Sequence, residues 1–400
     1  MPCERTEPPY AGLRVLELAR VLAGPWIGQT LADLGAEVIK VESPEGDETR
    51  RWGPPFLTNA DGSAADAAYF HSCNRGKESL VLDFRKSEDR ERVVRLARDA
   101  DVLIENFKVG GLGKYGLDYA SLARINPGLV YCSISGFGQQ GRYADRPGYD
   151  FVAQAMSGLM DITGEPGRPP QKVGVAVADI VTGLYGLIGI QAALAERTRS
   201  GRGQHVDVAL LDSTMGILAN QTMNHLIGKL MPTRMGNAHP NIVPYQEFRT
   251  ADGFIVIAVG NDPQFRCLCA ALGCAPLADD PRFATNEARV RNRSALEQIL
   301  APLLAALRRA DALVRLEAAR VPSGPINTVA EALADPNTRE RGMVVDSPVE
   351  GYGVASLPGL VTPIRFSRSQ TNASRPAPRL GSAGDKRGAW RSAIAGDDVE

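Results

Sequence analysis

The sequence predicts an α/β protein whose core is a doubly wound parallel sheet. Short apolar runs of strand length alternate with segments of helical character through the N-terminal part of the chain. The intervening segments are long enough to hold whole helices, which connections between parallel strands require. The chain has 400 residues, more than one ordinary core holds, so a second domain is also expected.

The first strand–helix–strand unit lies near the N-terminus. LRVLEL (13–18) is typical of a strand. PWIGQTLADLGA (25–36) is typical of a helix, because Pro25 takes an early helical position and Gly35 comes near its end. EVIKVE (37–42) supplies the next strand. Later strands and helices repeat the alternation, at 79–84, 87–100, 101–106, 129–135 and 205–211.

The character of the chain changes near residue 225. A stretch rich in proline and glycine precedes a hairpin, QEFRTADGFIVIAVG (246–260), in which an Ala-Asp-Gly turn separates two alternating apolar runs. Helical segments follow to about residue 320. We therefore predict a large domain over 1–224, a smaller α+β domain over 225–330, and a return to the large domain over 331–400.

Composition argues against several functions. The net charge is −1 and the mean hydropathy is −0.15, which leaves no electrostatic footprint for nucleic acid or an anionic membrane. The six cysteines form no CxxC pair and the four histidines show no HxxxH spacing, so no metal site is expected. The polar N-terminus lacks a secretory signal and scattered cysteines fit a reducing compartment, so we predict a cytoplasmic protein.

One carboxylate, Asp179, stands alone in a long apolar run. It is the only charged residue between Gly174 and Leu194, and a carboxylate is costly to dehydrate without hydrogen bonds. One interpretation is a helix cap, and the other is a catalytic nucleophile or base. The run could span a bilayer, but a central aspartate costs about 2.5–3.5 kcal/mol there, so we predict a core helix.

Two further patterns have competing interpretations. The glycine fingerprint at 136–141 follows a strand, but a proline-containing loop comes next instead of a helix, which disfavours NAD binding. Arg75, Lys77, Lys108 and Lys114 lie beside expected strands and form either a phosphate-binding patch or ordinary surface charge. No GxSxG elbow, P-loop or HExxH is present, which disfavours a hydrolase, an NTPase and a zincin.

Turn-rich loops of the predicted small domain are a third candidate site. Gly236, Asn237 and His239 lie in one loop, and Gly260 follows the hairpin. Exposed backbone N–H groups beside glycines suit the binding of an anion or oxyanion. The alternative is a set of turns without function, in which His239 is a structural histidine.

Several long motifs in one order give the chain a resemblance to a known family. The motifs are LAGPWIGQTLADLGAEVIKVESPEGDETR, NRGKESLVLDF, DVLIENFKVGGLGKYGL, PGYDFVAQAMSGLMDITG, VAVADIVTGLYG and SGRGQHVDVALLD. From about residue 10 to residue 381, the chain resembles the family III CoA-transferases. GNAHPNIVPYQEF, DGFIVIAVGNDPQF and PSGPIN are especially similar to the branch of succinyl-CoA:glutarate CoA-transferases.

The resemblance implies a mechanism and a fold. In this family the aspartate of the V-A-D-x-x-T-G segment is the nucleophile, and that position here is Asp179. Its carboxylate would attack the acyl-CoA thioester to give a mixed anhydride, and then an aspartyl-CoA thioester. No general base is expected, because an ordinary aspartate is ionised at pH 7. The implied fold is a Rossmann-like large domain built from both chain ends, in an interlocked, ring-like homodimer.

The resemblance also assigns binding residues. Val21, Leu22 and Ala23 would line the adenine end of CoA, and Tyr149 would lie near the acyl group. The CoA phosphates and ribose would be held by Asn74, Arg75, Lys77, Asn106, Phe107, Lys108 and Lys114. Substrate contacts are expected from Gly236, Asn237, His239 and Gly260. CoA and acyl-CoA would be substrates, with no tightly bound cofactor.

Two departures from the family pattern bear on binding. Ser43 stands where some members carry an arginine, which leaves one CoA phosphate contact of the family without its cation. The long glycine-only loop of the oxalate enzyme is absent, which argues against oxalate as acceptor. We expect succinyl-CoA as donor and a dicarboxylate of about four to six carbons, such as glutarate, as acceptor. Arg234, Arg289 and His239 are candidates to hold the second carboxylate.

Three alternative functions are open at this point. An α-methylacyl-CoA racemase of the same superfamily carries histidine at the position of Tyr149, and a tyrosine, with a pKa of about 10, shuttles protons poorly at neutral pH. A non-catalytic CoA-binding paralogue would have no use for Asp179. An NAD enzyme would use the loop at 136–141.

Overall fold

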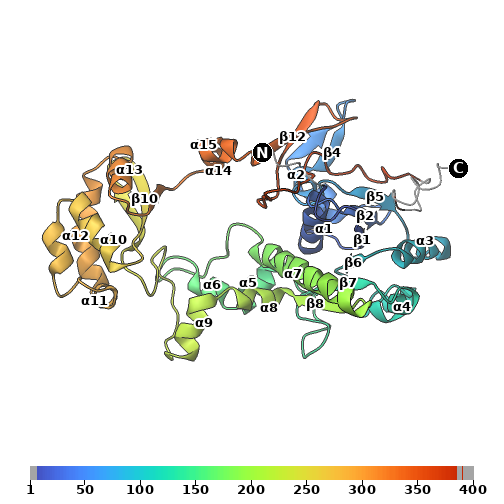
Figure 1. The fold of residues 1–400 in the computed structure, drawn as a ribbon, viewed down its shortest axis with the longest axis horizontal. Coiled ribbons are helices and arrows are strands. Elements are labelled where there is room, and N and C mark those ends of the chain that lie inside the picture. The colour runs from blue at the N-terminus through green and yellow to red at the C-terminus, as the bar shows by residue number, and fades with distance from the viewer. Residues whose placement is uncertain (1–6, 385–389, 391–400) are drawn as a thin grey trace. The chain divides into compact units, whose positions relative to one another are not determined.

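The computed structural model describes residues 7–384 and Trp390. The chain divides into two compact units (Figure 1). The first unit contains Met1–Leu159, Val173–Thr222 and Pro336–Glu400, so both ends of the chain belong to it. The second unit contains Met160–Lys172 and Met223–Asp335.

A six-stranded sheet of parallel strands forms the centre of the first unit. Its strands, in chain order, are β1 (Arg14–Glu17), β2 (Glu37–Glu42), β5 (Glu78–Val81), β6 (Val102–Glu105), β7 (Val130–Ser135) and β8 (His205–Ala209). Their spatial order is β5-β2-β1-β6-β7-β8. The strand order runs outward from β1 in both directions, so β1 and β6 are neighbours at the topological switch point. This order confirms the predicted doubly wound parallel sheet. Open α/β sheets bind ligands at such a switch point.

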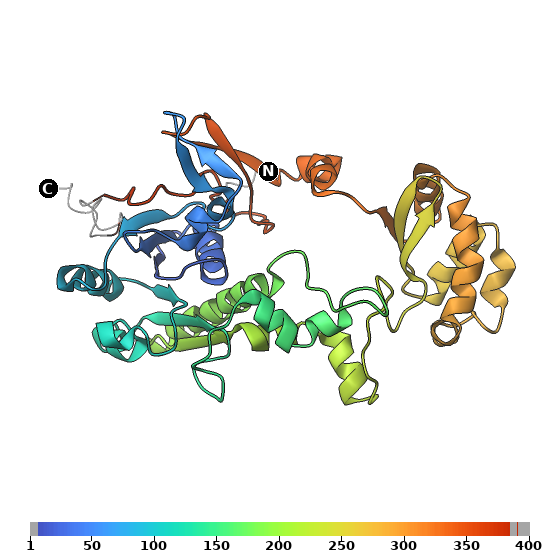
Figure 2. The same ribbon diagram turned by 180° about the vertical axis from the view of Figure 1, so that it is seen from behind.

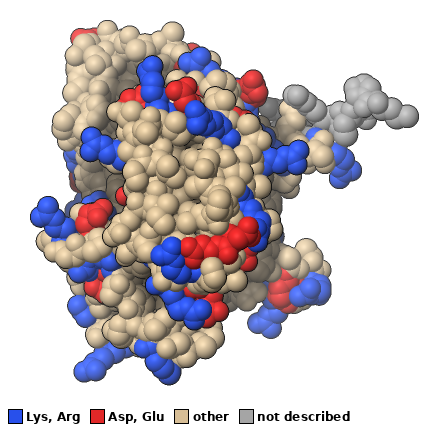
Figure 3. Space-filling view, turned by 90° about the vertical axis from the view of Figure 1, so that its left-hand side faces the viewer, with Lys and Arg blue, Asp and Glu red and all other residues tan. Residues whose placement is uncertain are grey.

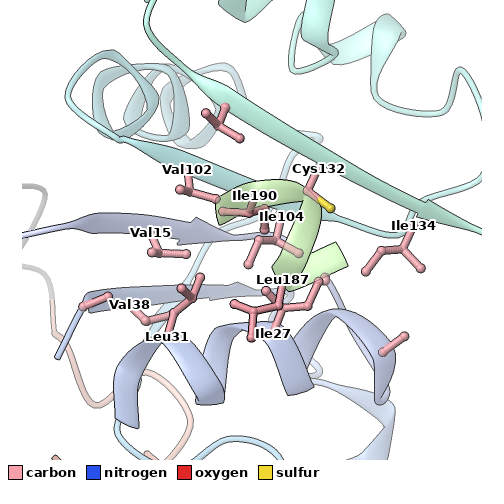
Figure 4. Close-up of a cluster of buried hydrophobic side chains, with 14 of the residues drawn as sticks. Val15, Ile27, Leu31, Val38, Val102, Ile104, Cys132, Ile134, Leu187 and Ile190 are labelled. Atoms are coloured by element: carbon pink, nitrogen blue, oxygen red, sulfur yellow. The ribbon is translucent and has the colours of Figure 1, made fainter. Parts of the chain in front are cut away.

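Helices cover both faces of this sheet (Figures 1 and 2). On one face, α1 (Ala23–Asp33) and α7 (Val177–Ser200) bury apolar side chains against the strands. Figure 4 shows this cluster, in which Ile27 and Leu31 of α1 and Leu187 and Ile190 of α7 meet the strand side chains. On the other face lie α3 (Ser87–Arg98) and α4 (Tyr119–Ile125). Successive strand residues point to opposite faces, so both faces of the parallel sheet are buried.

The first unit also holds shorter elements. Two small antiparallel pairs join β3 (Phe56–Thr58) to β4 (Ala64–Ala67) and β12 (Val344–Pro348) to β13 (Ser356–Leu360). The remaining α-helices within this unit or at its borders are α2 (Ala68–His71), α5 (Asp150–Met156), α6 (Leu159–Ile162), α8 (Leu210–Gly216), α9 (Ala219–Leu226) and α15 (Pro336–Glu340).

The second unit is an antiparallel sheet with helices on one face. β9 (Tyr245–Thr250) and β10 (Gly253–Ala258) form the predicted hairpin, and β11 (Ser323–Pro325) pairs with β10. Its helices are α10 (Asp262–Ala271), α11 (Asn286–Arg291), α12 (Arg293–Ala305), α13 (Arg309–Ala318) and α14 (Val329–Ala334). Ile255 and Ile257 face these helices and are buried with Phe265, Leu296 and Leu316. On the face seen in Figure 3, positive and negative side chains are interspersed.

Helix α7 is a core helix, as predicted. By length and hydropathy alone it could cross a membrane, but its glycines bring it close to α1. A Cβ at Gly183 would lie 2.9 Å from the carbonyl oxygen of Ala23, and one at Gly186 would lie 2.6 Å from Ile27 Cδ1. Glycine is thus required for the packing that holds the start of α7, and with it Asp179.

We expect Gly183→Ala to lower the free energy of unfolding by about 1–3 kcal/mol, because the new methyl group overpacks the contact between α1 and α7. Urea unfolding followed by circular dichroism measures the change. Gly174→Ala is the control, because a Cβ there meets nothing within 4 Å. If both variants unfold at the same urea concentration, the close helix contact does not exist.

Candidate active site

Asp179 lies in the first turn of α7, yet it does not cap the helix. The N-cap is Ala176, which has no capping side chain. The backbone N–H of Ala178 is instead accepted by Oδ1 of Asp150 at 2.8 Å, and Gln154 donates to Oδ2 of the same carboxylate at 2.8 Å. Within residues 7–384 and Trp390, Asp179 has no hydrogen-bond or ion-pair partner. The capping interpretation is therefore wrong for Asp179, and it applies to Asp150.

Asp179 faces a cavity of about 410 Å³, here named the Asp179 cavity. Residues that follow β1, β6 and β7 line it, together with the loop before α5 and the first residue of α8. It therefore lies at the carboxyl ends of neighbouring parallel strands, beside the switch point, where open α/β sheets bind ligands.

Seven of the residues predicted for binding share this cavity with Asp179: Val21, Leu22, Ala23, Asn106, Phe107, Lys108 and Tyr149. Two cations that were not predicted from the sequence also line it. Arg20 pairs with Glu48 at 2.6 Å, and Arg146 stacks on Tyr143. The place of Arg20, directly after the first strand of an α/β sheet, is the signal that would have indicated it.

Asn74, Arg75 and Lys77 are buried and satisfied by the protein itself. Arg75 binds the carboxylate of Asp33 with two nitrogens. Lys77 Nζ lies 2.8 Å from Oε2 of Glu17 and 2.8 Å from Oδ1 of Asn74. These contacts tie α1 and β1 to the segment before β5, and none of the three side chains lines the Asp179 cavity. A role for them in holding phosphates stays a prediction.

A second cavity of about 300 Å³ shares Arg20 and Phe107 with the first one and is here named the aromatic cavity. Phe84 lies between two other rings there, 6.1 Å from Phe107 and 5.9 Å from Tyr115, measured between ring centroids. Ser43, at the position where some relatives carry arginine, also lines it. Lys114 is exposed beside Tyr115, with Nζ 4.8 Å from the centre of that ring.

The Asp179 carboxylate is not fully ionised at neutral pH in the free protein. Burial, and to a smaller extent the negative charge of Asp150, raise its pKa to about 7. The expectation of an ordinary aspartate, ionised throughout at pH 7, is therefore wrong. The physical reason is that no cation or hydrogen-bond donor in the described part of the chain compensates the desolvated charge.

The rate of a reaction that needs ionised Asp179 should rise with pH through this pKa. Asp150→Asn removes the neighbouring negative charge but keeps an oxygen that accepts the N–H of Ala178, so ionisation becomes easier and the acid limb of kcat/KM should move to lower pH. Rates measured from about pH 5.5 to 8.5 test this shift. An acid limb that stays in place or moves to higher pH would contradict it.

The predicted residues of the small domain all lie in the second unit. Gly236 has a φ of 60° and donates its N–H to Gly164. The ring of His239 accepts the N–H of Asn241 at 3.1 Å, and burial together with nearby Arg293 lowers its pKa. Gly260 donates to Gln264 at 2.8 Å. These contacts give the two loops a defined conformation, and a substrate-binding role for Gly236, Asn237, His239 and Gly260 stays a prediction.

The three cations proposed to hold a second carboxylate differ in availability. Arg289 is fully buried, and each of its three nitrogens already donates within the second unit, to Val243, Phe283 and Asp262. Arg234 binds Asp161, but its Nε has no partner.

Among the described residues, no group of three or more His, Cys, Asp or Glu could hold a metal ion.

These features define the class of protein. A doubly wound α/β sheet places an unpaired carboxylate in a cavity lined by cations, at the edge of the sheet where such folds bind ligands. The model of CoA-transferase family III matches residues 10–383. The chain belongs to CoA-transferase family III, whose members act on acyl-CoA substrates and need no bound cofactor.

Relatives and solved structures agree with this assignment. The chain is 56% identical over 376 residues to a succinate–glutarate CoA-transferase of Agrobacterium fabrum, covering 94% of each chain. It is 40% identical over 374 residues to the human succinyl-CoA:glutarate CoA-transferase, covering 93% of this chain and 84% of that one. The crystal structure of a CAIB/BAIF family protein from Brucella suis is 56% identical, with a TM-score of 0.83 and coverage of 98% and 100%.

Proposed function

We propose that this enzyme transfers CoA from succinyl-CoA to a dicarboxylate such as glutarate, with Asp179 as the nucleophile. The observation that carries the proposal is the unpaired Asp179 carboxylate in a cavity at the carboxyl ends of the parallel strands. The relatives from Agrobacterium fabrum and human, whose names specify succinate or succinyl-CoA and glutarate, support this choice of substrates.

The proposed reaction exchanges acyl groups on one carboxylate. An oxygen of Asp179 attacks the thioester carbon, the C–S bond breaks, and CoA thiolate leaves a mixed anhydride of Asp179 and succinate. The thiolate then attacks the aspartyl carbon and expels succinate. The acceptor carboxylate attacks this aspartyl-CoA thioester, and the released thiolate finally takes the acceptor acyl group from the second anhydride. Asp179 is regenerated as a carboxylate.

The two cavities offer a route for the long CoA molecule. The thioester would lie beside Asp179, and the nucleotide would extend past Phe107 to the aromatic cavity, where a base can stack on Phe84 or Tyr115. Arg20, which lines both cavities, is the cation best placed to meet phosphate. In this arrangement Val21, Leu22 and Ala23, which share the cavity with Asp179, lie along the acyl-bearing end of CoA and not at its adenine end, where the resemblance would place them.

We also propose that the enzyme is a cytoplasmic homodimer. Large apolar side chains are exposed on α7 and α8, where Leu184, Tyr185, Ile188 and Met215 have exposed fractions of 44%, 43%, 58% and 52%. Such patches are typical of interfaces between subunits. The described cysteines are all free, as in a reducing compartment. Light scattering after size-exclusion chromatography tests the dimer, and a monomeric mass would contradict it.

An acyl-exchange assay tests the proposed reaction. Purified enzyme is incubated with succinyl-CoA and a panel of dicarboxylates of different length, and new acyl-CoA masses are measured. Glutaryl-CoA formed with matching loss of succinyl-CoA is the expected result, with some activity toward acceptors one carbon longer or shorter. Absence of any new acyl-CoA, with deuterium from solvent entering the α-position of a branched acyl-CoA, would overturn the transferase in favour of a racemase.

A further inference from the structure

Val21 adopts a backbone conformation that β-branched residues rarely take. Its φ is 70°, in the left-handed region, where the side chain and backbone crowd one another. In the described part of the chain, only three other residues besides glycines have positive φ. Val21 directly precedes Leu22, the N-cap of α1, and both line the Asp179 cavity. The strained residue therefore lies in the wall of the site.

Buried side chains bind both polar backbone groups of Val21. Its N–H donates to the carboxylate of Asp47, at 3.2 Å from Oδ2 and 3.4 Å from Oδ1. Its carbonyl oxygen accepts the thiol of Cys73 at 3.5 Å. Asp47 and Cys73 are 1% and 0% exposed, so water does not compete for these bonds. The unusual conformation is thus held from both sides.

Asp47 is in turn fixed by a network of buried charges. Lys40 Nζ lies 3.0 Å from Oδ2 of Asp47 and 3.0 Å from Oε1 of Glu17, and Glu17 also pairs with Lys77 at 2.8 Å. All four side chains are fully buried. The network contains two lysines and two carboxylates, and Asp47 connects it to the backbone of Val21.

Stability alone does not explain such an arrangement. Buried ion pairs can be replaced by apolar side chains without loss of stability, whereas local strain that persists at a site is held there by its surroundings and is commonly part of function. We propose that Asp47 is a positioning residue, which holds Val21 in the left-handed conformation so that Val21, Leu22 and Ala23 form the cavity wall against which the acyl-CoA is placed. This role rests on the proposed function, because the reaction in question is the proposed transfer of CoA.

A double-mutant cycle separates this role from a structural one. The effect of Asp47→Ala on kcat/KM is measured in three backgrounds: wild type, Val21→Gly and Val21→Ala. Glycine adopts positive φ without strain and no longer needs to be held, whereas alanine keeps the Cβ that makes this conformation costly. We expect Asp47→Ala to lower kcat/KM about tenfold or more in the wild-type and alanine backgrounds, but less than about threefold in the glycine background.

The cycle also cancels the other contacts of Asp47. Asp47 accepts hydrogen bonds from Thr49 and pairs with Lys40, and these contacts are lost equally in all three backgrounds. Rates are measured well below the melting temperature of each variant. Asp47→Leu, which keeps the approximate shape of the side chain but accepts no hydrogen bond, replaces Asp47→Ala in the cycle if the alanine variants do not fold. Equal losses in the glycine and alanine backgrounds, or no loss in wild type, would overturn the proposal.

Failure of the proposed function would be recognised separately. If the wild-type enzyme transfers no CoA, the same variants are compared by their affinity for CoA in a calorimetric titration. Val21, Leu22 and Ala23 line the cavity whatever the reaction is. The positioning role therefore predicts that Asp47→Ala lowers the affinity for CoA in the Val21→Ala background but not in the Val21→Gly background. An identical loss of affinity in both backgrounds would overturn it by this route as well.

Discussion

Asp179→Asn should lower the rate of CoA transfer by about 10⁴-fold or more, because the amide cannot form the anhydride that carries the reaction. The cavity should remain intact, since within the described part of the chain no hydrogen bond or ion pair depends on the carboxylate. Binding of CoA should therefore survive in the variant. Acyl-exchange rates and calorimetric CoA affinity, measured side by side, give the two expected results.

A covalent adduct provides independent evidence. Intact-protein mass spectrometry of wild-type enzyme with succinyl-CoA should show added mass from the aspartyl-CoA thioester, and the Asp179→Asn protein should show none. Asp179→Ala serves as a second variant that cannot revert by deamidation. Asp212→Asn is the matched control, because Asp212 is exposed in the first turn of α8 and lies outside both cavities. Substantial transfer by the Asp179 variants would rule out this nucleophile.

Lys40→Met should lower the free energy of unfolding by about 3–5 kcal/mol. Although burial opposes its charge, the carboxylates of Glu17, Asp47 and Glu42 raise the pKa of Lys40 above its ordinary value. The ammonium also donates to the carbonyl of Ala19 at 2.8 Å. Methionine fills similar space but leaves two buried carboxylates with only one buried lysine, Lys77, and such an uncompensated charge is what makes breaking a buried pair costly.

An exposed ion pair provides the comparison for this variant. Arg291 and Glu287 lie 2.8 Å apart on α11, with both side chains largely in solvent. Arg291→Ala should change the free energy of unfolding by less than about 0.5 kcal/mol. Urea titrations followed by circular dichroism compare the two variants under one condition. A Lys40→Met protein as stable as Arg291→Ala would contradict the expected cost of leaving a buried carboxylate without its cation.

The sheet was predictable because its signals are local. The segment 37–42 is rich in β-branched residues, which favour strands, and β2 has these bounds. Pro25 and Gly35 mark the ends of a helix through their own backbone preferences, and α1 begins two residues before Pro25 and ends two residues before Gly35. Each of these elements depends on neighbours within a few residues, so a single sequence is sufficient to place it.

The site was only partly predictable because its contacts join distant parts of the chain. Asp150 caps α7 by accepting the N–H of Ala178, which lies 28 positions later in the sequence. The partners of Arg75 and Lys77, which lie before them on α1 and β1, could not be identified from spacing. Burial of Asp179 is likewise a tertiary property, so its raised pKa could not be predicted from the sequence.

The division of the chain has a consequence for how such enzymes diversify. The second unit is encoded by two separate stretches, Met160–Lys172 and Met223–Asp335, and the polypeptide passes between the units four times. A single recombination event cannot exchange this unit alone, since the segment between its two stretches, Val173–Thr222, belongs to the first unit and carries Asp179. Variation in the second unit should therefore arise mainly by point substitution within one inherited scaffold.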